Sequence, residues 1–223
     1  MPTLSFIQKM RKSFLLLGFL LYLLSNQNSI MNIQPLLNYI RKIVTLTEEE
    51  ITFLTSQVTS RKYLKGQYIL QQGDINKSVC FVVSGCTKMF YVDTDGQEHI
   101  LMFAVEDWWS SDLGSFISQT PSDFNVQCLE DTECIVFSHN SMEETYAKIP
   151  KLERLFRKTI EKAFVASQKR IVRNFSMSAK ERYLIFKDSY PEIEQRIPQY
   201  MVASYLGITK EFLSKIKSQI ALQ

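Results

Sequence analysis

Apolar residues recur at helical spacing over a long stretch in the second half of the chain. Residues 151–174 contain no glycine or proline, and their apolar positions repeat about every 3.5 residues. The pattern predicts one helix of about 24 residues, about 36 Å long, which is more than one small domain needs. Such an apolar face favours a role as a dimer interface. The alternative is that the helix packs only on its own domain.

Residues from about 60 to 137 carry a different pattern, in which short β-rich runs alternate with glycine-containing turns. Asp95 and Gly96 give a hairpin turn signal between two of these runs. Many short strands with regular turns predict a small barrel or jelly roll. The expected strands are 68–70, 80–83, 87–92, 100–104 and 133–137.

The last 27 residues, 197–223, have the pattern of a helix-turn-helix. Gly207 stands at the turn, where glycine tolerates a positive φ, and the small Ala203 allows the two helices to approach closely. The second helix, Thr209 to about Gln219, is expected in the major groove of DNA, and a pair of ordinary surface helices is the alternative. Apolar residues occupy the positions that hold the helices together: Val202, Leu206, Ile208, Leu213 and Ile216.

The polar residues of that second helix should face outward together if its apolar residues face inward. Glu211 can accept from a cytosine amino group, and lysine can reach guanine without the planar fork of arginine. The residues predicted to bind DNA are Thr209, Lys210, Glu211, Ser214, Lys215 and Lys217. Further candidates for phosphate contacts, or else solvated charges, are Arg170, Arg173, Lys180 and Arg182.

The net charge of +3 conceals an asymmetry along the chain. Residues 31–150 hold 8 basic and 16 acidic side chains, whereas residues 151–223 hold 15 basic and 7 acidic ones. An acidic module followed by a basic module indicates that the second one meets a polyanion, which the helix-turn-helix pattern suggests is DNA.

The cysteines and histidines provide no recognisable metal site. Cys80, Cys86, Cys128 and Cys134 form no CxxC pair, and only two histidines are present. Buried free thiols are the expected state, with sensing thiols as the alternative. We therefore predict no metal and no cofactor, and a cupin-like barrel enzyme is disfavoured because its metal needs several histidines.

The first thirty residues resemble a signal peptide, since basic residues precede an apolar run at 14–24. That run is short for a membrane span, and no clean cleavage site follows it. We expect residues 1–30 to be a non-native upstream extension before a start at Met31, with a signal peptide or anchor as the alternative. No stable membrane association is expected.

A glycine-punctuated barrel, a long helix and a terminal helix-turn-helix together resemble the CRP/FNR family of bacterial transcription regulators, in its Bacteroidetes-type branch. The resemblance implies an α+β fold: a cyclic-nucleotide-binding-like β-roll (31–149), a dimerisation helix (150–174) and a winged-helix-type DNA-binding domain (175–223). Supporting stretches are 63–66, 71–74, 82–85, 111–114, 178–182 and 197–209.

The family's sensory chemistry is altered in this sequence. Where cyclic-nucleotide sensors carry Gly-Glu-Leu and then Arg-Ser, this chain has Ser111-Asp112-Leu113 and Ser122-Asp123. The resemblance makes these five residues the candidate ligand pocket. Because the Ser122-Asp123 pair lacks the cation that holds a cyclic phosphate and introduces a carboxylate, we expect no tight cAMP binding. No cysteine precedes the barrel, so an iron–sulfur sensor is not expected.

The sequence thus predicts a cytoplasmic, non-enzymatic transcription regulator that binds DNA as a homodimer without control by cAMP. RNA polymerase and an unidentified small-molecule effector are further partners that the resemblance allows. A regulatory protein that binds a cyclic nucleotide or another small ligand is the alternative function.

Overall fold

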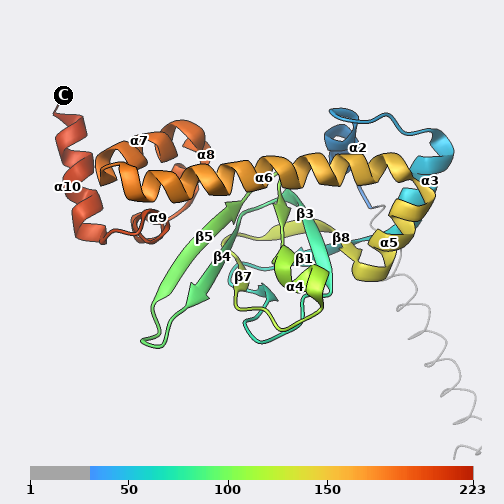
Figure 1. Ribbon diagram of the computed structural model, residues 1–223, viewed down its shortest axis with the longest axis horizontal. Helices are drawn as coiled ribbons and strands as arrows, with labels where there is room; N and C mark the ends of the chain where they lie inside the picture. The colour runs from blue at the N-terminus through green and yellow to red at the C-terminus, as the bar shows by residue number, and fades with distance from the viewer. Residues whose placement is uncertain (1–30, 223) are drawn as a thin grey trace, which may run out of the picture. The chain divides into compact units, whose positions relative to one another are not determined.

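The computed structural model describes residues 31–222, and the expectations for residues 1–30 lie outside this range. Two helices come first, α2 (Gln34–Arg41) and α3 (Glu48–Gln57), and Thr47 and Glu50 form the capping box at the start of α3. The described part then runs through eight strands before its long helix (Figure 1). These strands are β1 (Val58–Tyr63), β2 (Tyr68–Leu70), β3 (Ser78–Ser84), β4 (Thr87–Val92), β5 (Glu98–Ala104), β6 (Trp109–Ser110), β7 (Asn125–Cys128) and β8 (Thr132–Ser138).

The strands form two four-stranded antiparallel sheets, ordered β1-β8-β3-β6 and β2-β7-β4-β5. The α+β class with a β-roll is therefore confirmed. Strands β1, β6 and β7 were not expected from the sequence. In β1 only Val58 is buried, so apolar and polar residues do not alternate along it. Strands β6 and β7 span two and four residues, which is too short for an alternating pattern to signal a strand.

Between β6 and β7 lies the short helix α4 (Leu113–Ser118), and α5 (His139–Lys148) follows β8. The long helix α6 (Pro150–Ser176) matches the predicted helix and extends it at both ends. Its first turns are anchored, because Leu152 and Leu155 are each 1% exposed. Most of its later apolar residues are exposed to solvent: Ile160, Phe164, Val165, Ile171, Val172 and Phe175.

The carboxy-terminal helices are α7 (Ala179–Ser189), α8 (Pro191–Arg196), α9 (Gln199–Leu206) and α10 (Lys210–Ala221). Gly207 adopts φ 67° between α9 and α10, as the turn required. Ala203, Val202, Leu206, Leu213 and Ile216 are buried as expected, and Ile208 is partly buried. The helix-turn-helix geometry follows directly from this apolar pattern.

One hydrophobic cluster joins the β-roll to the helix-turn-helix. It contains Phe90 and Phe103 from the strands together with Phe186, Leu206 and Leu213 from the helices. The acidic and basic halves of the sequence therefore share a core, even though their charges differ.

Within residues 31–222, no helix combines the length and the apolar character that crossing a membrane requires.

Candidate nucleic-acid interface and ligand pocket

The outward face of α10 carries most of the residues predicted to bind DNA. Thr209 is the N-cap, and its Oγ1 accepts from the backbone N–H of Phe212 at 3.2 Å. Lys210, Glu211, Ser214 and Lys215 are all exposed. A helix with this polar face, held from behind by Leu213 and Ile216, is free to meet a ligand along one side.

Lys217 lies near Lys210 and Ser214 on α10, but its side chain is engaged by a neighbouring helix. Its Nζ donates to Glu194 Oε1 on α8 at 3.1 Å and sits 5.8 Å from the centre of the Tyr183 ring. Burial opposes ionisation of Glu194, but the hydrogen bonds from Tyr183 and Lys217 outweigh it and lower its pKa. The structure thus places Lys217 in a contact that holds α10 to α8.

Arg170, a candidate phosphate contact from the sequence, is turned inward instead. It lies 4.0 Å over the ring of Tyr205 and donates to the carbonyl oxygens of Tyr205 at 3.0 Å, of Ile100 at 3.2 Å, and of Leu101. These bonds join α6, β5 and the end of α9. The expectation of a phosphate contact for Arg170 was wrong, because its donors are used within the protein. Arg182 donates to Asn174 at 3.1 Å.

Arg196 makes a second connection between the helices and the β-roll. Its guanidinium donates to Glu106 at 2.7 and 3.1 Å and to Glu130 at 3.0 and 2.8 Å. The hydrogen bonds that Arg196 donates to Glu130 and Glu106 raise its pKa further above its ordinary value. Burial opposes ionisation of Glu106, but its bonds to Arg196 and to backbone amides prevail and lower its pKa. Sequence patterns gave no sign of this pairing.

Three residues of the candidate ligand pocket of the β-roll form hydrogen bonds with neighbouring protein groups. Asp112 is 6% exposed; its Oδ1 accepts from the amides of Gly114 and Ser115 at the start of α4, and its Oδ2 accepts from Ser122 Oγ at 2.6 Å. Ser111 Oγ accepts from Asn76 at 2.7 Å. The carboxylate that the resemblance assigns to a ribose is therefore occupied by protein donors.

The other two residues of that candidate pocket lie at the surface. Leu113 is 36% exposed and Asp123 is exposed. The structure thus brings Asp112 and Ser122 together, whereas Leu113 and Asp123 are exposed to solvent.

The four cysteines are free and buried, as the sequence suggested. Burial raises the pKa of Cys86 to about 12 and that of Cys128 to about 11. Such thiols stay protonated at neutral pH and react slowly. His99 Nε2 lies 2.6 Å from Asp93 Oδ2 on the exposed hairpin between β4 and β5, where it stabilises the turn.

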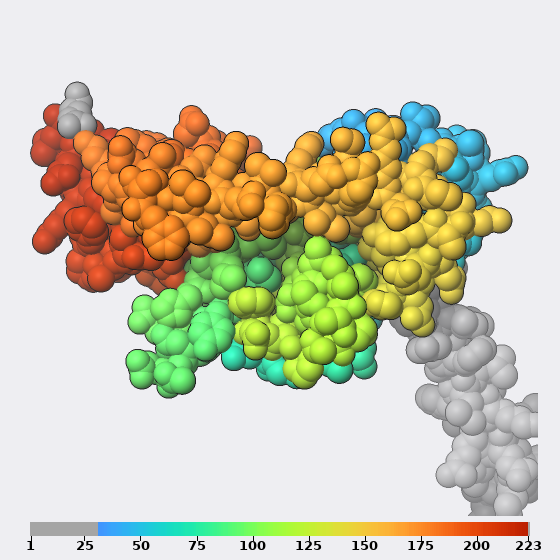
Figure 2. All heavy atoms as spheres, in the orientation of Figure 1, coloured from blue at the N-terminus to red at the C-terminus, as the bar shows by residue number. Residues whose placement is uncertain are grey.

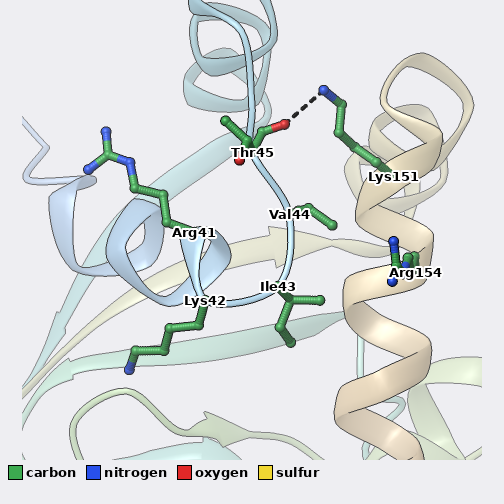
Figure 3. Close-up of a pocket in the computed structure, with 7 residues that line it drawn as sticks. All are labelled: Arg41, Lys42, Ile43, Val44, Thr45, Lys151 and Arg154. Carbon is green, nitrogen blue, oxygen red and sulfur yellow. Dashed lines mark hydrogen bonds between the residues drawn. The ribbon is translucent and has the colours of Figure 1, made fainter.

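A hollow of about 340 Å³ lies between residues 41–45 and the first turns of α6 (Figure 3). It is lined by cations, but they do not converge. Arg41 and Lys42 point away from α6, and Lys42 donates to Asp107 at 3.0 Å. Lys151 donates to Thr45 O at 2.9 Å and pairs with Glu50. The cationic groups therefore do not point to one place in the hollow, as an anion-binding site requires.

Comparisons with known proteins agree with this architecture. The profile of the family described as "Cyclic nucleotide-binding domain" matches residues 60–148. The chain is 25% identical over 186 residues to Regulatory protein HlyX of Actinobacillus pleuropneumoniae, covering 77% of this chain and 76% of HlyX. It is 24% identical over 186 residues to the Fumarate and nitrate reduction regulatory protein of Vibrio cholerae, covering 77% and 73%.

Solved structures share the fold at low sequence identity. A CooA mutant from Carboxydothermus hydrogenoformans superposes with a TM-score of 0.66 at 14% identity, over 86% of this chain and 85% of CooA. The c-di-GMP responsive regulator CLP of Xanthomonas campestris gives a TM-score of 0.64 at 13% identity, over 79% and 92%.

Proposed function

This chain belongs to the CRP/FNR family of transcriptional regulators, and we propose that it regulates transcription by binding DNA as a homodimer. The observation that carries the proposal is the α9–Gly207–α10 unit, whose outward face holds Lys210, Glu211 and Lys215 free of ion pairs with the described residues. A recognition helix held in this way can enter a major groove with its first turns against the base edges.

The charged side chains of α10 are suited to recognising specific base pairs in DNA. Lys210 and Lys215 would reach guanine O6 and N7, Glu211 would accept from cytosine, and Thr209 would contact a phosphate. Lys215 lies four residues after Glu211, so the two share one side of the helix. We propose these residues and Ser214 as the DNA contacts, and we leave Lys217 out because Glu194 engages it.

Dimerisation would use the exposed face of α6. Ile160, Phe164, Ile171 and Phe175 recur at spacings of 4, 7 and 4 residues, so they form one stripe. Figure 2 shows α6 lying uncovered by other described elements along the face in view. A second copy would cover this stripe and place two copies of α10 for two half-sites. Residues 150–174 then serve as the dimerisation segment, with 31–149 as the sensory part and 175–223 as the DNA-binding part.

Control by cAMP is not part of the proposal. The position of the phosphate-holding cation carries Ser122, whose hydroxyl is bound to Asp112, and Asp123 follows it. A cyclic phosphate would meet two carboxylates and no matched cation there, which disfavours binding. The alternative, a regulatory protein that binds a cyclic nucleotide, draws on the domain match over residues 60–148.

The remaining parts of the proposal follow from family membership. The curated relatives are named as regulatory proteins, so we infer no enzymatic activity, a cytoplasmic site of action, and contact with RNA polymerase at a bound promoter. We propose that any effector of the β-roll is a small molecule other than cAMP.

A gel-shift titration of the full chain against mixed genomic duplexes in rising salt tests the proposal. We expect the affinity to fall steeply with salt, because binding to phosphates releases counterions. Absence of a shifted species at low salt would refute DNA binding.

A further inference from the structure

Phe212 is an exposed aromatic residue in the first turn of α10. Its side chain is 49% exposed, whereas the neighbouring Leu213 is 1% exposed. Its ring makes no aromatic contact with another described residue, although many of the other aromatic rings of the described chain do. Helix packing therefore does not account for a phenylalanine at this position.

The backbone of Phe212 is held in place. Its N–H donates to Thr209 Oγ1 at 3.2 Å, and the next residue, Leu213, donates to Thr209 O at 3.0 Å while its side chain enters the core. An exposed ring on a fixed first turn can be aimed at a ligand with little loss of backbone freedom.

The neighbours of Phe212 are the residues proposed to bind base edges. Glu211 precedes it, and Lys215 lies three residues later, where Cβ atoms on a helix are about 5–6 Å apart. The first turns of a recognition helix meet the bases, and phenylalanine is among the side chains that contact the 5-methyl group of thymine. One exposed apolar residue is ordinary on a protein surface, but here it stands among the proposed contacts.

From this placement we infer that Phe212 is a specificity-determining residue that selects a thymine through its 5-methyl group. That thymine lies within about two base pairs of the base contacted by Lys215, given a rise of about 3.4 Å per pair. The inference rests on the proposed function, because it requires α10 to enter the major groove.

The test begins with selection of a preferred duplex from a random pool by the full chain. Each thymine of the selected half-site is then replaced in turn by uracil, which removes only the 5-methyl group. We expect one replacement in each half-site to weaken binding about fourfold. This factor corresponds to the free energy of burying one methyl group.

Variants assign that effect to Phe212. In Phe212→Ala the duplexes with thymine and with uracil should bind equally, whereas Phe212→Leu should keep most of the difference. Leu222→Ala, at an 89% exposed residue just after α10, should keep all of it. Circular dichroism and low-salt affinity for unrelated DNA check that each variant is folded.

Two results would overturn the inference and leave the proposed function standing. One is a selected sequence in which no uracil replacement matters; the other is a uracil penalty that persists in Phe212→Ala. A pool that yields no preferred sequence would instead overturn sequence-specific binding itself.

Discussion

The guanidinium of Arg170 lies 4.0 Å above the ring of Tyr205 and donates to its carbonyl oxygen at 3.0 Å. The same side chain binds the carbonyls of Ile100 and Leu101, so α6, β5 and α9 meet at one arginine. Ser204 adds a parallel link, since its hydroxyl donates to Glu98 O at 2.8 Å and accepts from the Ile100 amide at 3.1 Å. The helix-turn-helix is therefore fixed to the β4–β5 hairpin by directional bonds as well as by apolar packing.

Replacing Arg170 by alanine should lower the free energy of unfolding by about 2–3 kcal/mol, because carbonyl oxygens lose a charged donor. Urea unfolding followed by circular dichroism measures the loss. Arg157→Ala, on the same helix in an exposed ion pair with Glu161, should cost under about 1 kcal/mol. Equal costs for the two variants would show that the contacts of Arg170 contribute little.

The Arg196–Glu106 pair should make stability depend on acid pH. The pKa of Glu106 in the folded protein lies below its ordinary value of 4.5, so its contribution is present above that pH and is lost as pH falls through the folded pKa. In Arg196→Leu that pKa should return toward the ordinary value. The difference in unfolding free energy between wild type and variant should therefore shrink as pH falls below about 4.5.

Urea midpoints at a series of pH values check this prediction. A difference that stays constant across the range would mean that Arg196 acts through packing and not through charge.

Acidic substitutions on the exposed stripe of α6 should separate the proposed dimer. Phe164→Glu and Phe175→Glu would place a carboxylate in an apolar seam, which is costly, but both positions are exposed in the single chain and so its folding should be spared. Sedimentation velocity should show monomers for both variants and a dimer for Leu222→Glu. A wild-type chain that sediments as a monomer at all concentrations would contradict the proposed seam.

Two lysines of α10 should respond differently to alanine substitution. Lys215→Ala should weaken DNA binding and reduce the salt slope by about one, because it removes a cation from the side of α10 that is proposed to face DNA. Lys217→Ala should leave the slope unchanged, because Lys217 is bound to Glu194. A reduced salt slope in Lys217→Ala would show that Lys217 contacts DNA, as the sequence predicted.

Glu211→Ala should relax the preference for one base pair, at a cost of about 1–3 kcal/mol against the wild-type sequence. Competition binding with duplexes altered at single positions measures this preference. Unchanged discrimination at every position would remove Glu211 from base reading.

The melting temperature should not rise with cAMP or cGMP. At about 1 mM nucleotide, a dissociation constant of about 10 µM would add about 2.7 kcal/mol, which a thermal-shift assay detects easily. A rise of several degrees would support the cyclic-nucleotide alternative in spite of Asp123.

Local pattern was sufficient for much of this fold. The helical period of residues 151–174, the glycine at position 207 and the apolar positions of the last helix each depend on neighbours within a few residues, so they could be predicted. The burial of Val202, Leu213 and Ile216 confirmed that pattern. The predicted DNA contacts, and the Bacteroidetes-type branch, stay predictions.

Only the tertiary structure decided what the charged and polar side chains contact. Arg170, Arg196 and Lys217 look alike as basic residues in the sequence, yet each finds partners 23 to 90 residues away. Asp112 likewise meets Ser122 because α4 and the following loop fold back on each other. Apolar periodicity records which face of an element is buried, whereas a long polar side chain bonds to whatever donor or acceptor the packed elements bring within reach.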